Sequence, residues 1–187
     1  MTTTKDDLIQ ECRDNALYAY GTARIFEKRA ISLRNKMRIT TFFGLVVPLL
    51  FGSVALSFGT GSQLLTFLLP LTGVVVTIQL VTTLWGLIAK WDDEYGYSIG
   101  SMKANTHLWH KWDALSKSKE DDFESTFRNL TETNNNQELE DSQKAITDKE
   151  KRFAMRSALF FFKRACATCG NVPNSMKPIV CDTCGNY

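Results

Sequence analysis

Charged and apolar positions are distributed very unevenly along this chain. No Asp, Glu, Lys or Arg occurs between Arg38 and Lys90, a window of 51 residues that is rich in large apolar side chains. A helix rises about 1.5 Å per residue, so about 20 residues cross the roughly 30 Å of bilayer hydrocarbon. The window therefore predicts two transmembrane helices, at residues 39–58 and 64–89. Glycines and hydroxyl side chains at residues 57–63 predict the turn between them.

The flanks of this window set the expected orientation. Five basic residues lie at positions 28–38, just before the first predicted span, whereas the predicted turn carries no charge. Positive charge marks the cytosolic side of a membrane protein, and two crossings return the chain to the side that it left. Both termini are therefore expected in the cytosol. The basic residues are Lys28, Arg29, Arg34, Lys36 and Arg38. A buried helical pair in a soluble core would need other apolar faces around it, which the polar flanks do not supply.

The N-terminal flank has the pattern of one long helix. Small or apolar residues recur at alternating spacings of four and three over residues 8–37, which predicts a helix with a continuous seam. Its alanines permit close approach of another helix, and the seam is too small-sided to hold lipid. We expect it to pack on other helices of the chain or on a second copy. The seam comprises Leu8, Cys12, Ala16, Ala19, Ala23, Phe26, Ala30, Leu33 and Met37.

The segment after the second span is also expected to be helical. Apolar residues keep the same spacing over residues 108–130, which predicts one long helix or two joined helices. The asparagine run at 133–136 is interpreted as a turn or flexible link. A further helix is expected from about Glu138 to Arg164, where apolar residues lie a heptad apart.

Four of the five cysteines lie near the C-terminus. They form two Cys-x-x-Cys pairs, each followed by glycine and separated by eleven residues. Such turns direct two thiolates toward one point, and two turns complete a tetrahedral metal site. Zinc is the expected metal, and iron, which accepts the same ligands, remains the alternative. The predicted ligands are Cys166, Cys169, Cys181 and Cys184.

This metal is expected to be structural. Disulfides would conflict with a cytosolic location, where thiols stay reduced. The segment has too few apolar residues for a core of its own, so metal binding should fold it. Four protein ligands also leave no position for water or substrate. The expected fold is thus an all-α membrane protein: a cytosolic helix (1–38), a two-helix transmembrane hairpin (39–89), a cytosolic helical region (90–164) and a small module like a zinc ribbon (165–187).

Two sets of polar residues are candidates for ion conduction. Two helices enclose no lumen, so a pore would need several copies with the less apolar stripe of one span turned inward. The candidate stripe on the second span is Thr72, Gln79, Thr83 and Gly86. Gln79 has an alternative role, bonding to the first span or to another copy. The candidate cytosolic mouth is Asp92, Asp93 and Glu94, expected to face Lys36 and Arg38.

Two classes of function are considered. One is a membrane pore built from several copies, and the other is a membrane-anchored zinc adapter that recruits a protein or nucleic acid. An enzyme is not expected, because there is no phosphate loop, no nucleophile beside a base and no open metal site. Lys163, Arg164 and Lys177 are too few for a convincing nucleic-acid footprint.

The order of these elements resembles a known family. The alanine seam, the hairpin with its short turn, the cytosolic helices and the cysteine spacing resemble the SLATT proteins, two-transmembrane effectors of nucleotide-signalling bacterial defence systems. The chain looks most like the branch named for its Cys-x-x-Cys, eleven residues, Cys-x-x-Cys ending and found on mobile elements. This resemblance implies an effector that permeabilises the bacterial inner membrane and halts or kills the cell. It also implies a nucleotidyltransferase or a nucleotide-signal sensor from the same operon as partner.

Overall fold

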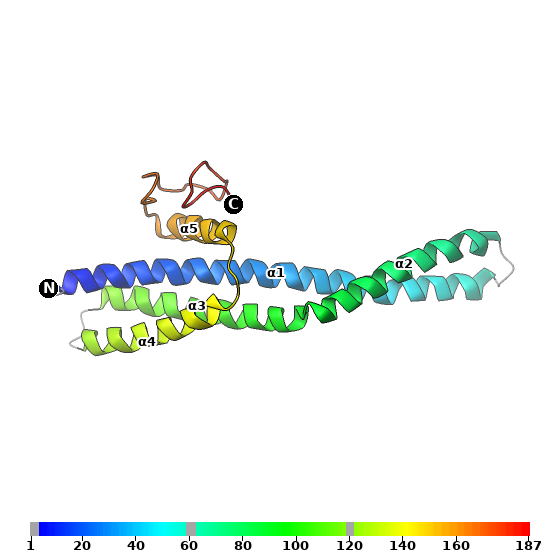
Figure 1. Cartoon of the computed structure of the whole chain (residues 1–187), viewed down its shortest axis with the longest axis horizontal. Coiled ribbons are helices and arrows are strands. Elements are labelled where there is room, and N and C mark those ends of the chain that lie inside the picture. The colour runs from blue at the N-terminus through cyan, green and yellow to red at the C-terminus, as the bar shows by residue number, and fades with distance from the viewer. Residues whose placement is uncertain (1–3, 59–62, 119–121) are drawn as a thin grey trace. The chain divides into compact units, whose positions relative to one another are not determined.

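The structure is a computed structural model that describes residues 4–58, 63–118 and 122–187, without the side chains of residues 51, 54, 55, 58, 63–65, 68 and 69. The residues described form helices and no strands, which confirms the all-α prediction (Figure 1). The helices are α1 (Lys5–Phe58), α2 (Gln63–Ile88), α3 (Trp91–Lys117), α4 (Phe123–Ser142) and α5 (Asp148–Phe162). The chain beyond α5 is formed of turns and irregular segments.

Contacts divide the chain into two compact units. The first, which we call the helical unit, contains the chain up to Arg29 together with Tyr97–Tyr187. The second, the hairpin unit, is Ala30–Gly96. Helix α1 belongs to both and continues without interruption through residues 38 and 39, where the sequence pattern changes from amphipathic to apolar. Each unit is described by itself below.

The predicted alanine seam is the centre of the helical unit. Cys12, Ala16 and Ala19 are buried against apolar residues of α3 and α4, among which Trp112 is fully buried. Burial raises the pKa of the Cys12 thiol to about 11, so this cysteine is an inert core residue. The prediction that α1 packs on other helices of the chain is therefore confirmed for this unit.

The predicted turn at residues 133–136 is wrong, because these residues lie inside α4. Asn134 is buried, and its Oδ1 accepts a hydrogen bond from Trp112 Nε1 at 3.3 Å. Its Nδ2 donates to Glu138 Oε1 at 3.0 Å, one turn further along the same helix. Asparagine favours turns when its side chain bonds to nearby backbone. Here both ends of the amide are occupied by side chains, so the helix continues.

The prediction of a single helix over 138–164 is also wrong, because the helix is interrupted between Ser142, the end of α4, and Asp148, the start of α5. Ala145 adopts a positive φ of 33°, and Thr147 caps α5. Thr147 and Glu150 form a capping box in which the Glu150 N–H donates to Thr147 Oγ1 and the Thr147 N–H donates to Glu150 Oε2. The sequence carried this signal, since a Thr followed three residues later by Glu is typical of a helix start.

A buried carboxylate sets the register between α3 and α4. Asp141 is only 4% exposed. Its Oδ1 accepts hydrogen bonds from Tyr97 Oη at 2.8 Å and Ser101 Oγ at 2.6 Å. Its Oδ2 accepts one from Asn105 Nδ2 at 2.7 Å. These partners come from successive turns of α3, so sliding α4 along α3 would leave a buried charge unpaired.

In the hairpin unit, α1 and α2 lie side by side and antiparallel (Figure 1). Helix α2 agrees with the second predicted span to within one residue at each end. Of the predicted turn, residues 59–62 lie outside the described residues. Among the residues that are described, a single segment, Pro70–Ile88, is long and apolar enough to cross a membrane, and none of it is buried. The first predicted span, 39–58, includes four side chains outside the described residues.

Candidate metal centre

The two Cys-x-x-Cys segments fold into similar tight turns. The Gly170 N–H donates to Cys166 O at 2.8 Å, and the Gly185 N–H donates to Cys181 O at 2.9 Å. The third residues of the two motifs, Thr168 and Thr183, meet with their hydroxyl oxygens 2.5 Å apart. The two turns are therefore related in conformation and placed face to face, as expected for two halves of one site.

The glycine after each pair is required for a different reason. Gly170 has a φ of 70°, a left-handed conformation that side chains disfavour. At Gly185 the constraint is space, because a Cβ there would lie 1.9 Å from Ile179 O. In the second turn the left-handed residue is Asn186, with a φ of 54°. The sequence indicated that both turns need a glycine. Only the backbone shows that Gly170 is needed for its left-handed φ and Gly185 for the space beside Ile179 O.

The sulfur atoms have the spacing that a tetrahedral metal needs. All four Sγ atoms lie within 4.8 Å of one another, and those of Cys169 and Cys184 are 3.8 Å apart. Zinc–sulfur bonds of about 2.3 Å in a regular tetrahedron place the sulfurs about 3.8 Å apart. The cysteines are free thiols, three of them buried and Cys169 half-buried. The prediction that these four residues form one cluster is confirmed, and the donor set fits a closed structural site.

The electrostatics of the site favour thiolate at one ligand in particular. Backbone N–H groups of Cys184 and Thr183 donate to the Cys181 sulfur and lower its pKa to about 7. Burial raises the pKa of Cys184 above the usual range. A bound cation would offset that penalty, because metal coordination stabilises thiolate directly.

A comparison with known proteins gives the family. A family model described as Mobilome CxxCx(11)CxxC protein matches residues 9–187. The chain belongs to this family. No curated protein and no solved structure matches it. Because the match begins at residue 9, the pattern of the Mobilome CxxCx(11)CxxC family includes α1 and the hairpin unit as well as the cysteines.

In this member of the family the cysteine module is built into the helical unit. Cys166, Cys181 and Cys184 share a buried cluster with Leu17 of α1 and Leu159 of α5. The C-terminal residue is anchored as well, since Tyr187 Oη donates to the carbonyl of Met176 and its ring packs edge-on against Phe153 at 5.6 Å. Arg164 Nη1 pairs with Asp14 Oδ1 at 2.7 Å. The cysteine module therefore shares its buried contacts with both α1 and α5.

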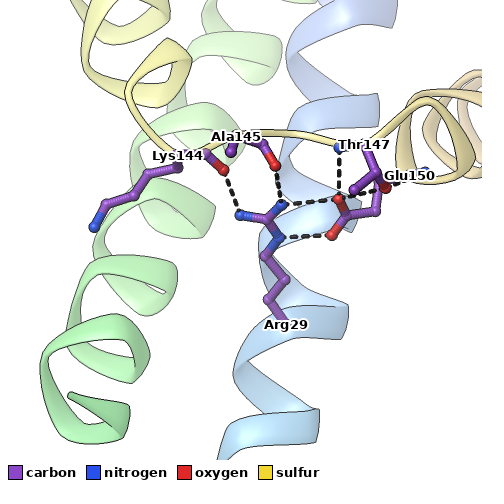
Figure 2. Close-up of polar contacts among 5 residues, drawn as sticks. All are labelled: Arg29, Lys144, Ala145, Thr147 and Glu150. Atoms are coloured by element: carbon purple, nitrogen blue, oxygen red, sulfur yellow. Dashed lines mark hydrogen bonds and ion pairs between the residues drawn. The ribbon is translucent and has the colours of Figure 1, made fainter. Parts of the chain in front are cut away.

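Arg29 is a structural residue whose role the sequence did not reveal, since its charge suggested only membrane orientation. Its guanidinium fixes the segment between α4 and α5 onto α1 (Figure 2). Nε donates to Glu150 Oε1 at 2.6 Å and Nη2 to Glu150 Oε2 at 2.8 Å. Nη1 and Nη2 also donate to the carbonyls of Lys144 and Ala145, at 2.9 and 3.2 Å. The bonds from Arg29 to the Glu150 carboxylate are the main reason why the pKa of Glu150 falls to about 2.

The candidate pore stripe divides between two environments. The carboxamide of Gln79 lies over Gly44 of α1, where an added Cβ would be 2.8 Å from Gln79 Nε2. A Cβ at Gly86 would lie 2.9 Å from the Trp91 ring. Thr72 is half-buried, whereas Thr83 is exposed. Gln79 thus lies against the first helix and Thr83 is exposed, and the pore-lining and bonding roles of these residues stay predictions.

The acidic cluster lies in the first turn of α3, where carboxylates interact favourably with the helix dipole. Asp92 and Asp93 are exposed, and Glu94 is half-buried. Lys36 Nζ lies 5.8 Å from the centroid of the Trp91 ring, next to the cluster in sequence. Lys36 is thus close to the start of α3, while the ion pairs of Lys36 and Arg38 with these acids stay a prediction.

Proposed function

We propose that this protein is a membrane effector of a bacterial antiviral defence system. In this proposal several copies associate through the hairpin unit, form a pore in the inner membrane and cause growth arrest or cell death. One observation carries the proposal: the hairpin unit exposes large apolar side chains along both of its helices.

The extent of this apolar surface separates it from an ordinary protein surface. Leu49 and Leu56 of α1 and Phe67 and Ile88 of α2 are each at least 71% exposed. In the hairpin unit the large exposed residues recur from Ile31 to Leu56 of α1 and from Phe67 to Ile88 of α2. Soluble monomers rarely expose contiguous apolar patches larger than a few hundred Å², whereas bilayer hydrocarbon covers such a surface at no cost. Two crossings, at 39–58 and 64–89, would bury both helices in lipid.

The residues at one end of the hairpin support a cytosolic orientation for both termini. Trp85 is 62% exposed, and the Trp91 ring lies beside Lys36. Tryptophan and lysine at the same level are typical of the membrane–water interface. The acids Asp92, Asp93 and Glu94 would then surround the cytosolic mouth in an oligomer, and Thr83 is the stripe residue best placed to face a lumen.

The defence role rests on the resemblance to the SLATT proteins together with membership in a mobilome family. On this basis the trigger is a nucleotide signal, made or sensed by a protein from the same operon. The structural metal, zinc in this proposal, holds the cysteine module on α1 and α5 and leaves no open position for catalysis.

The experiment is inducible expression in bacteria, with and without the genomic neighbours, while a dye reports membrane potential. The protein is expected in the membrane fraction, and depolarisation is expected on triggering by the neighbours. A protein recovered in the soluble fraction would contradict the membrane proposal. Membrane insertion without depolarisation under any condition would contradict the pore.

One observation favours an adapter as the second candidate. On the cysteine module Val180 is 93% exposed and Val172 is 49% exposed. Apolar side chains on a rigid metal-bound surface suit a protein partner. If the hairpin is only an anchor, Val180→Asp should abolish function while depolarisation never occurs. If the pore proposal holds, cells expressing matched levels of Val180→Asp should still depolarise when the hairpin is intact and triggered.

A further inference from the structure

A groove opens between the two helices of the hairpin unit. It has a volume of about 310 Å³. Most of its wall is apolar, and its polar side chains are Thr40, Gln79 and Thr82. The lining residues are Ile39, Thr40 and Phe43 of α1 with Val75, Ile78, Gln79 and Thr82 of α2.

The polar groups of the groove differ in whether they are paired. Thr40 Oγ1 donates to Lys36 O at 3.0 Å, and Thr82 Oγ1 donates to Ile78 O at 2.8 Å. Both hydroxyls are thus satisfied within their own helices. The Gln79 carboxamide makes no hydrogen bond with any described residue, although it lies against Gly44. It has two N–H donors and an oxygen acceptor, all of them available.

The depth of Gln79 in the proposed membrane span makes an unpaired carboxamide energetically costly. It lies 16 residues from the first residue of α2 and 9 from the last, which corresponds to roughly 24 and 14 Å along the helix axis. Lipid headgroups at either end are therefore out of reach. Acyl chains offer no hydrogen bonds, and an unpaired amide in hydrocarbon is strongly unfavourable.

We propose that the groove binds a second copy of this chain, with the Gln79 carboxamides of the two copies hydrogen-bonded to each other. A carboxamide both donates and accepts, so it is complementary to itself, as the contact of a two-fold pair requires. Gly44 leaves the space in which the amide lies. This inference rests on the proposed membrane location and deepens it by naming the contact between copies.

The test compares two neighbouring phenylalanines, one inside the groove and one outside it. Phe43 lines the groove, while Phe42 is exposed to a similar extent and does not line it. The photo-crosslinker p-benzoylphenylalanine is placed at one or the other position in the full chain, and membranes are irradiated. A crosslinked dimer is expected from position 43 and not from 42. Equal yields from both positions would overturn the proposal.

Substitutions then test the amide itself. Gln79→Leu should lower the dimer yield from position 43 by about three- to tenfold, the range for an interhelical hydrogen bond in a membrane. The matched control is Thr77→Leu, since Thr77 is exposed and bonds to Gly73 O within its own helix. Gly44→Ala should displace the Gln79 amide and also lower the dimer yield. Gly52→Ala should leave the yield unchanged, because nothing lies within 4 Å of a Cβ there. An unchanged yield in Gln79→Leu would overturn the proposal.

The outcomes separate this inference from the proposed function. Recovery of the protein in the soluble fraction would overturn both. A membrane protein that depolarises cells but crosslinks equally from both positions would overturn the groove contact alone. A groove dimer in membranes that never depolarise would support the contact and contradict the pore.

Discussion

Trp112 and Phe26 of the helical unit are fully buried, whereas Leu56 and Phe67 of the hairpin unit are more than 80% exposed. The two units also differ in how their polar groups are paired. The Asp141 carboxylate is buried with hydrogen bonds to its oxygens, while Gln79 lies in an apolar groove with no partner among the described residues. The helical unit thus buries its largest apolar side chains and pairs its buried carboxylate. The exposed apolar side chains of the hairpin unit are the observation on which the membrane proposal rests.

The largest expected effect concerns the metal ligands of the helical unit, because metal binding is expected to fold the cysteine module. Cys184→Ser should abolish stoichiometric metal binding and unfold the cysteine module, since binding of a structural zinc contributes about 10–16 kcal/mol in small domains. Metal content by mass spectrometry and hydrogen exchange over 148–187 measure this. Cys12→Ser is the matched control: it should keep one metal per chain despite a buried polar group. Full metal occupancy in Cys184→Ser would contradict the site.

Substitution of the two glycines of the cysteine module, Gly170 and Gly185, by alanine should lower metal affinity to different extents. Gly185→Ala places a Cβ 1.9 Å from a backbone oxygen, so the second turn must open and metal affinity should fall severely. Gly170→Ala meets no atom within 4 Å and imposes only a left-handed φ, which costs about 1–2 kcal/mol. Competition with a chromophoric chelator measures both affinities. Equal losses would show that space does not decide the second turn.

Arg29→Ala should destabilise the helical unit by up to about 3 kcal/mol, since one unit of pKa shift corresponds to about 1.4 kcal/mol and bonds from Thr147 supply part of the shift of Glu150. The pKa of Glu150 falls from 4.5 to about 2 in the folded chain. Because the folded pKa is lower, this stabilisation is complete above about pH 4.5 and is lost as pH falls toward 2. Urea unfolding at several pH values measures it.

The control for Arg29 is Arg24→Ala. Arg24 pairs with Glu27 on the same helix, where both side chains are more than a third exposed. Such pairs contribute about 0–1 kcal/mol. Arg29→Lys keeps the charge but not the two parallel bonds to Glu150, so it should fall between wild type and Arg29→Ala. If Arg24→Ala and Arg29→Ala lose the same pH dependence of stability, the bonds from Arg29 to Glu150 are not its source.

The smallest expected effect concerns the acids at the end of the hairpin. Replacing Asp92, Asp93 and Glu94 with Asn or Gln should lower the cation preference of the proposed pore, because a ring of carboxylates concentrates cations. The free energy of unfolding should fall only slightly, by about 0.3–1 kcal/mol for each charge removed from the helix start. Reversal potentials across planar bilayers with a salt gradient measure the preference. Unchanged selectivity would place the acids away from the mouth.

Local patterns in the sequence determined much of this protein. The absence of charge between Arg38 and Lys90 predicted apolar helices, and the alanine seam predicted the buried face of α1. The two cysteine pairs predicted one four-sulfur cluster. These signals are readable because periodicity and tight-turn chemistry involve residues that are neighbours in the chain.

Only the tertiary structure decided where the middle helices end and which polar groups are paired. Asn134 stays helical because Trp112, from another helix, occupies its amide. The break before α5 is fixed by Arg29, which is 121 residues from Glu150. The environment of Gln79 depends on the absence of a side chain at Gly44. Each of these outcomes depends on contacts between residues far apart in the chain, and no pattern of neighbouring residues contains that information.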